Sequence, residues 1–61
     1  PNTTMIVEEK AYWYMGNAYI NIEKWEKARK AVYEAYIQHG IYRNAAESLL
    51  EHLDARLSES E

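Results

Sequence analysis

The chain has 61 residues, no cysteine, and a net charge of −3 from seven basic and ten acidic side chains. A chain of this length forms one domain that hides only about 60 % of the surface exposed when it is unfolded, so we expect marginal stability. Small domains usually need a disulfide, a metal or a neighbouring subunit. The absence of cysteine excludes a disulfide and a thiolate metal site.

Nucleic acid and membranes are not expected partners. Binding to phosphate backbones draws on a concentrated basic surface, and the chain is acidic overall. No apolar stretch approaches the roughly 18 to 20 residues that cross a bilayer. The chain begins at Pro1 and not at methionine, so we expect it to be a piece of a longer protein. Its short basic cluster is of mixed sign and comprises Lys24, Lys27, Arg29 and Lys30.

The first predicted helix runs from Met5 to about Ile22, with Thr3 or Thr4 as its N-terminal cap. Gly16 interrupts the pattern at a cost of about 1 kcal/mol relative to alanine. We therefore expect it to let a second helix approach closely. The predicted core row of this helix comprises Tyr12, Met15, Tyr19 and Ile22, with Ala11 and Ala18 beside it.

The second predicted helix runs from Trp25 to His39. Gly40 follows directly, where a left-handed residue would end the helix. The apolar row of this helix again has steps of three and four residues and comprises Trp25, Ala28, Val32, Ala35 and Tyr36.

A third amphipathic helix is predicted up to about Leu57, before a polar tail. Connections of only two to four residues predict that consecutive helices are antiparallel neighbours. No alternating β-type run competes with this interpretation, so the predicted fold class is all-α. The apolar row of the third helix comprises Tyr42, Ala46, Leu49, Leu50, Leu53 and Leu57.

The spacing of these residues resembles the tetratricopeptide repeat, a helix pair with conserved aromatic and small positions. The resemblance covers residues 9–42, and residues 43–57 would then be a capping helix. Glu23 and Lys24 stand at the turn that usually carries glycine in this family. The matching positions are Tyr12, Met15, Gly16, Tyr19, Ala28, Val32 and Ala35, with Gly40 in place of the final proline.

The resemblance implies that residues 1–61 form a single tetratricopeptide-like domain, an antiparallel helical hairpin plus a third, capping helix. Such a unit is a fragment of an α-α superhelix. At least about three repeats are normally needed for stability. One repeat with a cap therefore implies either further repeats upstream or self-association through an exposed face.

Repeats of this family bind peptides and protein segments along their first helices. Trp13 and Tyr14 are expected to face outward there, as large aromatics that are common in binding hot spots. The alternative is that both pack on an adjoining repeat or on a second copy. Asn17 matches an asparagine that grips a peptide carboxylate in some members, but Trp13 replaces the lysine of that clamp, so we do not expect a clamp. The predicted partner-binding residues are Lys10, Trp13, Tyr14, Asn17, Ile20 and Asn21.

No metal, cofactor or catalytic site is predicted. His39 and His52 stand on different helices with no cysteine near them, and no further ligand occurs at ligand spacing. Acid–base catalysis needs a pocket that shifts the pKa of a carboxyl group, and three short helices are too thin to enclose one.

The sequence therefore predicts a noncatalytic module for protein–protein interaction, a tetratricopeptide-type scaffold that binds a peptide or protein segment. The alternative is a free-standing helical oligomerisation domain that self-associates through the same aromatics.

Overall fold

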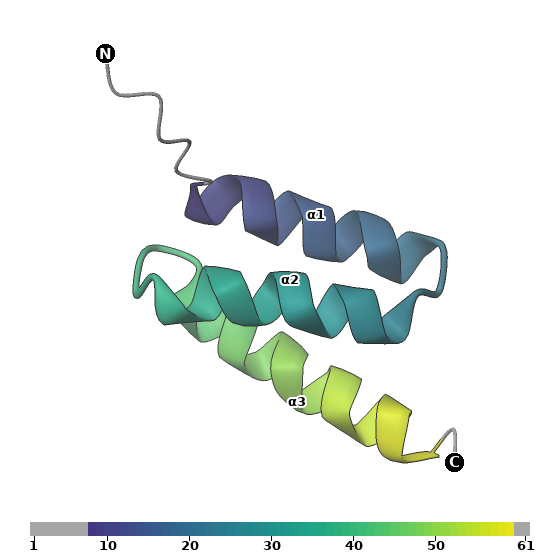
Figure 1. The fold of residues 1–61 in the computed structure, drawn as a ribbon. Helices are drawn as coiled ribbons and strands as arrows, with labels where there is room; N and C mark the ends of the chain where they lie inside the picture. The colour runs from purple at the N-terminus through teal and green to yellow at the C-terminus, as the bar shows by residue number, and fades with distance from the viewer. Residues whose placement is uncertain (1–7, 60–61) are drawn as a thin grey trace.

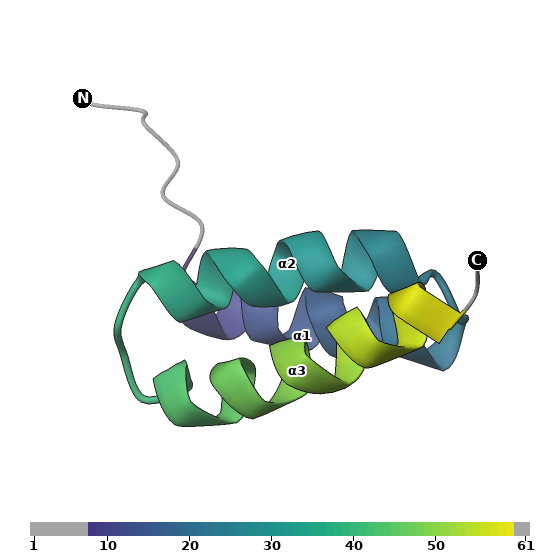
Figure 2. The same ribbon diagram turned by 90° about the horizontal axis from the view of Figure 1, so that it is seen from below.

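The computed structural model describes residues 8–59, which form three α-helices joined by short connections (Figure 1). They are α1 (Glu9–Asn21), α2 (Trp25–Ile37) and α3 (Arg43–Glu59). Helix α2 packs against both of the others, and α3 crosses it at an angle (Figure 2). The predicted all-α class is confirmed.

The helix boundaries differ from the predicted ones by a few residues. Helix α1 begins at Glu9 because Glu8 has an extended backbone, whereas the predicted start at Met5 and the caps at Thr3 or Thr4 lie outside the described residues. Helix α2 ends at Ile37, before His39, and α3 continues to Glu59. Residues 38–42 form a longer connection than predicted.

Helix α1 ends in a left-handed turn that a glutamate makes. Glu23 has a φ of 61°, the backbone N–H of Lys24 donates to the carbonyl of Tyr19 at 2.9 Å, and that of Glu23 donates to Ile20 at 2.9 Å. These two hydrogen bonds close a Schellman motif, in which the left-handed position is usually glycine.

The expected role of Gly40 as the left-handed residue after α2 is wrong. His39 takes that conformation instead, with a φ of 57°, while no glycine among the described residues has a positive φ. Gly40 instead makes room for the side chain of Glu9, because a methyl group at position 40 would overlap the carboxylate of Glu9.

Gly16 has the packing role that its position predicts. A Cβ atom at residue 16 would lie 2.5 Å from Cγ2 of Val32 and 3.5 Å from the carbonyl oxygen of Ala28. Real Cβ atoms do not approach another carbon this closely, so only glycine lets α1 lie against α2 at this height.

The rows of α2 and α3 are confirmed as core rows. From α2, Ala28, Val32 and Ala35 are buried. Trp25 and Tyr36 pack partly buried against the core cluster. From the predicted third row, Tyr42 just before α3 and five residues of α3 are buried or partly buried, namely Ala46, Leu49, Leu50, Leu53 and Leu57.

The predicted core row of α1 is only partly right. Tyr19 packs against the core, but the side chains of Met15 and Ile22 are 41 % and 61 % exposed. Trp13 and Ile20 pack against the core instead. Helix α1 is therefore rotated so that the face carrying Trp13 and Ile20 turns inward.

Glu9 connects the beginning of α1 with the beginning of α3. Its Oε2 accepts a hydrogen bond from the backbone N–H of Tyr42 at 2.9 Å, one residue before α3 starts. A carboxylate is favourable near a helix N-terminus because of the helix dipole. The carboxylate of Glu9 lies near the N-termini of both α1 and α3. The bare Cα of Gly40 leaves room for this side chain.

We expect Gly16→Ala to lower the free energy of unfolding by about 1–2 kcal/mol. The added methyl overlaps Val32, which costs more than the roughly 1 kcal/mol gained in helix propensity. Val32→Ala removes the overlapping atoms, so the double variant should be more stable than the sum of the single losses by about 1 kcal/mol. Urea unfolding followed by circular dichroism measures all three, and additive losses would contradict the contact.

We expect Glu9→Gln to destabilise the fold by about 1 kcal/mol, because a neutral amide replaces a charge-assisted hydrogen bond at the start of α3. Glu8→Gln is the matched control, since it removes the same charge from an exposed neighbour. Urea unfolding of both variants tests the contact. Equal losses would mean that Glu9 acts only through the dipole of α1.

Candidate functional site

The structure separates the predicted partner-binding residues into a packed set and an exposed set. Trp13 stacks on Tyr42, with ring centroids 5.1 Å apart and an angle of 18° between the planes. Trp13 and Ile20 also pack against the core cluster. The expectation that Trp13 faces outward is therefore wrong, because Tyr42 stacks on its ring and the core cluster packs against it.

Asn17 is half-buried, and its Nδ2 donates to the backbone carbonyl of Trp13 at 2.8 Å. This hydrogen bond uses the amide within α1 itself. Tyr14 faces outward as expected, with 58 % of its surface exposed. Lys10 and Asn21 are also exposed, so Lys10, Tyr14 and Asn21 are the predicted residues that lie exposed at the surface.

A stripe of exposed, uncharged side chains runs along α1 on the side away from the core. Tyr14, Met15 and Ile22 are its large members, at 58 %, 41 % and 61 % exposure. Sequence reasoning missed this stripe because it assigned Met15 and Ile22 to the core. We name it the α1 outer face, and it comprises Ala11, Tyr14, Met15, Ala18 and Ile22.

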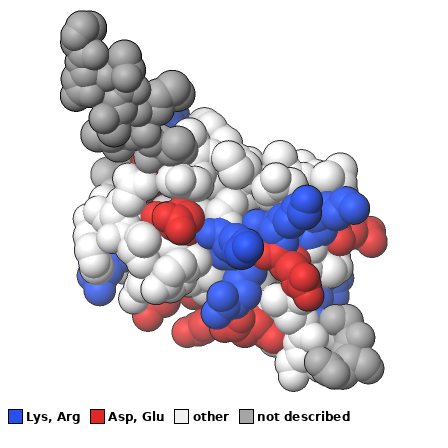
Figure 3. Space-filling model, viewed as in Figure 1, with Lys and Arg blue, Asp and Glu red and all other residues white. Residues whose placement is uncertain are grey.

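A shallow hollow of about 290 Å³ lies beside the α1 outer face, in the seam between α1 and α2. Met15 belongs to both, so the two surfaces are continuous. Figure 3 shows lysine and arginine side chains gathered over α2 and an uncharged surface over α1. We name this region the α1–α2 hollow, and it is lined by Tyr12, Met15, Tyr19, Lys27, Lys30, Ala31 and Glu34.

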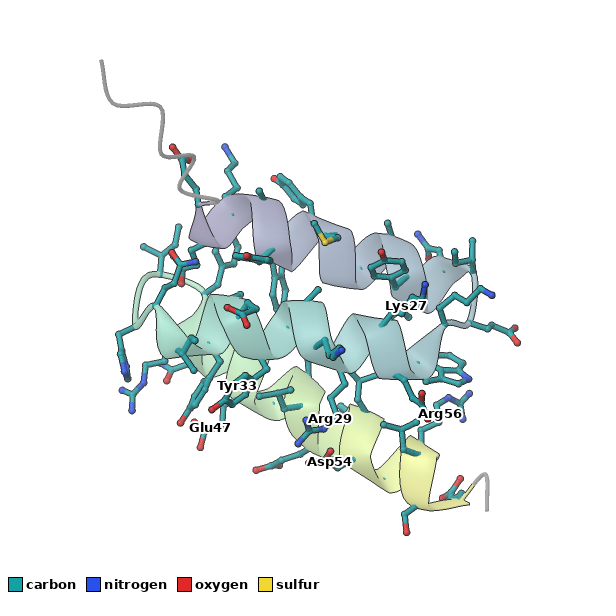
Figure 4. The ribbon with its side chains drawn as sticks, in the orientation of Figure 1. Lys27, Arg29, Tyr33, Glu47, Asp54 and Arg56 are labelled. Carbon is teal, nitrogen blue, oxygen red and sulfur yellow. The ribbon has the colours of Figure 1, made fainter. Side chains whose placement is uncertain are left out.

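Charged contacts tie α3 to α2 on the other side of the molecule. Arg29 pairs with Asp54, the sole ion pair found in residues 8–59. The hydrogen bond that Arg29 Nε donates to Oδ1 of Asp54 is the main reason that the pKa of Arg29 is raised. Figure 4 shows this pair between the two helices, with Lys27 on a different side of α2. Lys27 therefore has no ion-pair partner within this part of the chain.

A second hollow, of about 300 Å³, lies where α2 begins and α3 ends. Trp25 contributes its wall, and the guanidinium carbon of Arg56 lies 4.5 Å from the centre of the indole ring. This cation–π contact already occupies one face of the ring. The contact between Arg56 and Trp25 holds the end of α3 against α2. We therefore interpret the second hollow as a feature of helix packing and not as a binding site.

Neither a metal-ligand cluster nor a membrane-spanning helix is found among the described residues. Residues 8–59 contain no cluster of three or more His, Cys, Asp or Glu side chains that could hold a metal ion. Within the same residues, no helix combines the length and the apolar character that crossing a bilayer requires. The arrangement can supply apolar area and phenol groups at an open surface, and tyrosine and methionine are enriched in contacts between protein chains.

Comparison with known proteins gives no relative from which to transfer a function. No protein-family model, curated protein or solved structure matches this chain.

We expect the Tyr42 phenol to make the free energy of unfolding fall at alkaline pH. Partial burial raises its pKa above the ordinary value of 10.0, and the neighbouring Tyr14 and Glu9 add to that rise. Above pH 10 the unfolded chain loses this proton while the folded chain keeps it, so the free energy of unfolding falls as pH rises. Tyr42→Phe should make that decline shallower, and Tyr14→Phe should do so in part.

Urea unfolding from about pH 9 to about pH 11 measures the decline for each variant. The difference in free energy of unfolding between each variant and the unmodified chain at neutral pH gives the packing cost of the lost hydroxyl. This difference is subtracted from the values at alkaline pH. The same slope in Tyr42→Phe and the unmodified chain would show that another group causes the alkaline loss.

Proposed function

We propose that this chain is a noncatalytic protein–protein interaction module of tetratricopeptide type, which binds a protein segment along the α1 outer face and the α1–α2 hollow. The observation that carries the proposal is the α1 outer face itself. Tyr14, Met15 and Ile22 leave 58 %, 41 % and 61 % of their surfaces in water on a helix whose opposite side is packed. A continuous apolar surface of this kind is typical of an interaction site.

The packing of the first helix pair supports the repeat type. Gly16 lies against Val32 and Ala28, the small and branched positions of the second helix that the repeat pattern contains. Ala35, the next small position, is also buried. In a stack of such helix pairs, each pair buries its open face against a neighbour. The α1 outer face is open in this way.

The proposed surface is displaced around α1 from the residues that the sequence pattern favours. Trp13, Asn17 and Ile20 are engaged within the module, while Lys10, Tyr14 and Asn21 stand where a bound segment can meet them. Tyr14 is the strongest candidate for a binding hot spot, since it combines a large apolar ring with a hydroxyl that can form hydrogen bonds.

The apolar energy available at this face is modest. Covering a large side chain completely contributes about 1.5–3 kcal/mol, and each of these side chains is already partly covered. The stripe alone therefore contributes about 3–4 kcal/mol, less than the cost of association in many estimates. A partner must also use the α1–α2 hollow and its lysines to bind well.

A photo-cross-linking amino acid at position 18, in the middle of the α1 outer face, tests the proposal in cells that make the protein. Ala18 is exposed and small, so the probe should leave the fold intact. We expect ultraviolet light to join position 18 to a defined protein, identified by mass spectrometry. The same probe at Ser48, an exposed position on α3, should give at least about tenfold less of that product.

Two results would contradict this function. One is the absence of any adduct at position 18 while the probe-bearing chain remains helical. The other is equal yield of the same product from positions 18 and 48, which would indicate random encounters.

A further inference from the structure

We infer that the partner of the α1 outer face is a second copy of this chain, bound antiparallel about a two-fold axis that passes near Met15. This inference rests on the proposed function, because it names the partner of that same surface. Three properties of the described residues carry it: a small core, a charge pattern that complements itself, and aromatic positions that share one centre.

The core of a single copy is small. Among residues 8–59, only Val32 and Leu53 combine nearly complete burial with a side chain larger than a methyl group. A domain of this size with no disulfide commonly gains its missing burial by oligomerisation. The other buried hydrophobic residues are Ala28, Ala31, Ala35 and Ala46.

The charges along the α1–α2 hollow are arranged so that a reversed copy complements them. Lys27 and Glu34 both line the hollow from α2, seven residues and about 10 Å apart. In an antiparallel two-fold pair, both α2 helices lie on the same side of the interface and run in opposite directions. Lys27 of each copy then stands beside Glu34 of the other, so two ion pairs form together.

The two tyrosines of the hollow are placed symmetrically about the same height along the helices as Lys27 and Glu34. Tyr12 and Tyr19 line it from α1, and the midpoint between them falls at Met15 and Gly16. The midpoint between Lys27 and Glu34 falls at Lys30 and Ala31. Because Gly16 lies against Ala28 and Val32, the two midpoints are at the same height. One two-fold axis can therefore pair both sets.

The shape of the α1 outer face also suits a second α1 helix. Ala11 and Ala18 are exposed and small enough for two helix axes to approach to about 8–10 Å. Tyr14, Met15 and Ile22 flank them with exposed apolar surface. Two such faces bury their larger side chains against the small residues of each other.

Lys30 distinguishes a second copy from an acidic partner. It lines the hollow at the height of the axis, so the two Lys30 side chains of a dimer repel each other. Lys30→Gln should then tighten self-association several-fold. An acidic segment bound in the hollow would instead bind less tightly to this variant, because it loses an attractive charge.

Sedimentation equilibrium of the purified chain over a wide range of dilution tests the inference. We expect a monomer–dimer equilibrium, with Ala18→Glu weakening the dimer at least tenfold while circular dichroism shows an unchanged helix content. Ser48→Glu is the matched control on α3 and should leave the dimer intact. A chain that stays monomeric at every concentration, or a dimer indifferent to Ala18→Glu, would overturn the inference.

Charge exchange tests the antiparallel geometry. Lys27→Glu and Glu34→Lys should each weaken the dimer several-fold, since each makes both ion pairs repulsive. The double variant should restore the original affinity. Failure of the double variant to recover would overturn the proposed arrangement.

The two proposals fail in different ways. A monomeric chain that still cross-links to another protein through position 18 would reject the second copy and leave the interaction module standing. A monomeric chain with no adduct at position 18 would reject both.

Discussion

The close contact of α1 with α2 at Gly16 is the constraint on which the rest of the structure depends. A side chain at this position would meet Val32, so the absence of one lets the two helices lie backbone to backbone. At this separation Trp13 and Ile20 pack against the shared core. Met15, on the opposite side of α1, is left at the surface. The same contact thus creates both the core and the exposed face.

The placement of α3 depends on a contact between residues far apart in the sequence. Glu9 accepts a hydrogen bond from the backbone of Tyr42, and this brings the ring of Tyr42 over Trp13. An aromatic that would otherwise be the most prominent hydrophobic group of α1 is covered as a result. The large apolar side chains that remain exposed along α1 are therefore those of the α1 outer face, and Tyr14 is the aromatic one among them.

The accuracy of the sequence interpretation varies among the helices for a physical reason. Helix α2 alternates buried small residues with charged ones. Its core row could therefore be recognised from the spacing of three and four residues alone. Helix α1 carries Tyr12, Trp13, Tyr14 and Met15 in succession, and apolar groups therefore point in every direction around it. The helical period of α1 could not show which of these side chains the rest of the fold would cover. Of the predicted partner-binding residues, Trp13 and Ile20 are therefore packed against the core, whereas Tyr14 is exposed.

The sequence by itself determined the number of helices, their approximate limits, the rows of α2 and α3, and the close approach at Gly16, because these follow from local spacing and side-chain size. Only the tertiary structure decided the rotation of α1 and the left-handed conformation of His39. Both depend on groups distant in the chain or on how a connection must close. The exposed face of α1 belongs to this second class, since a helix face is open only when no other part of the fold covers it.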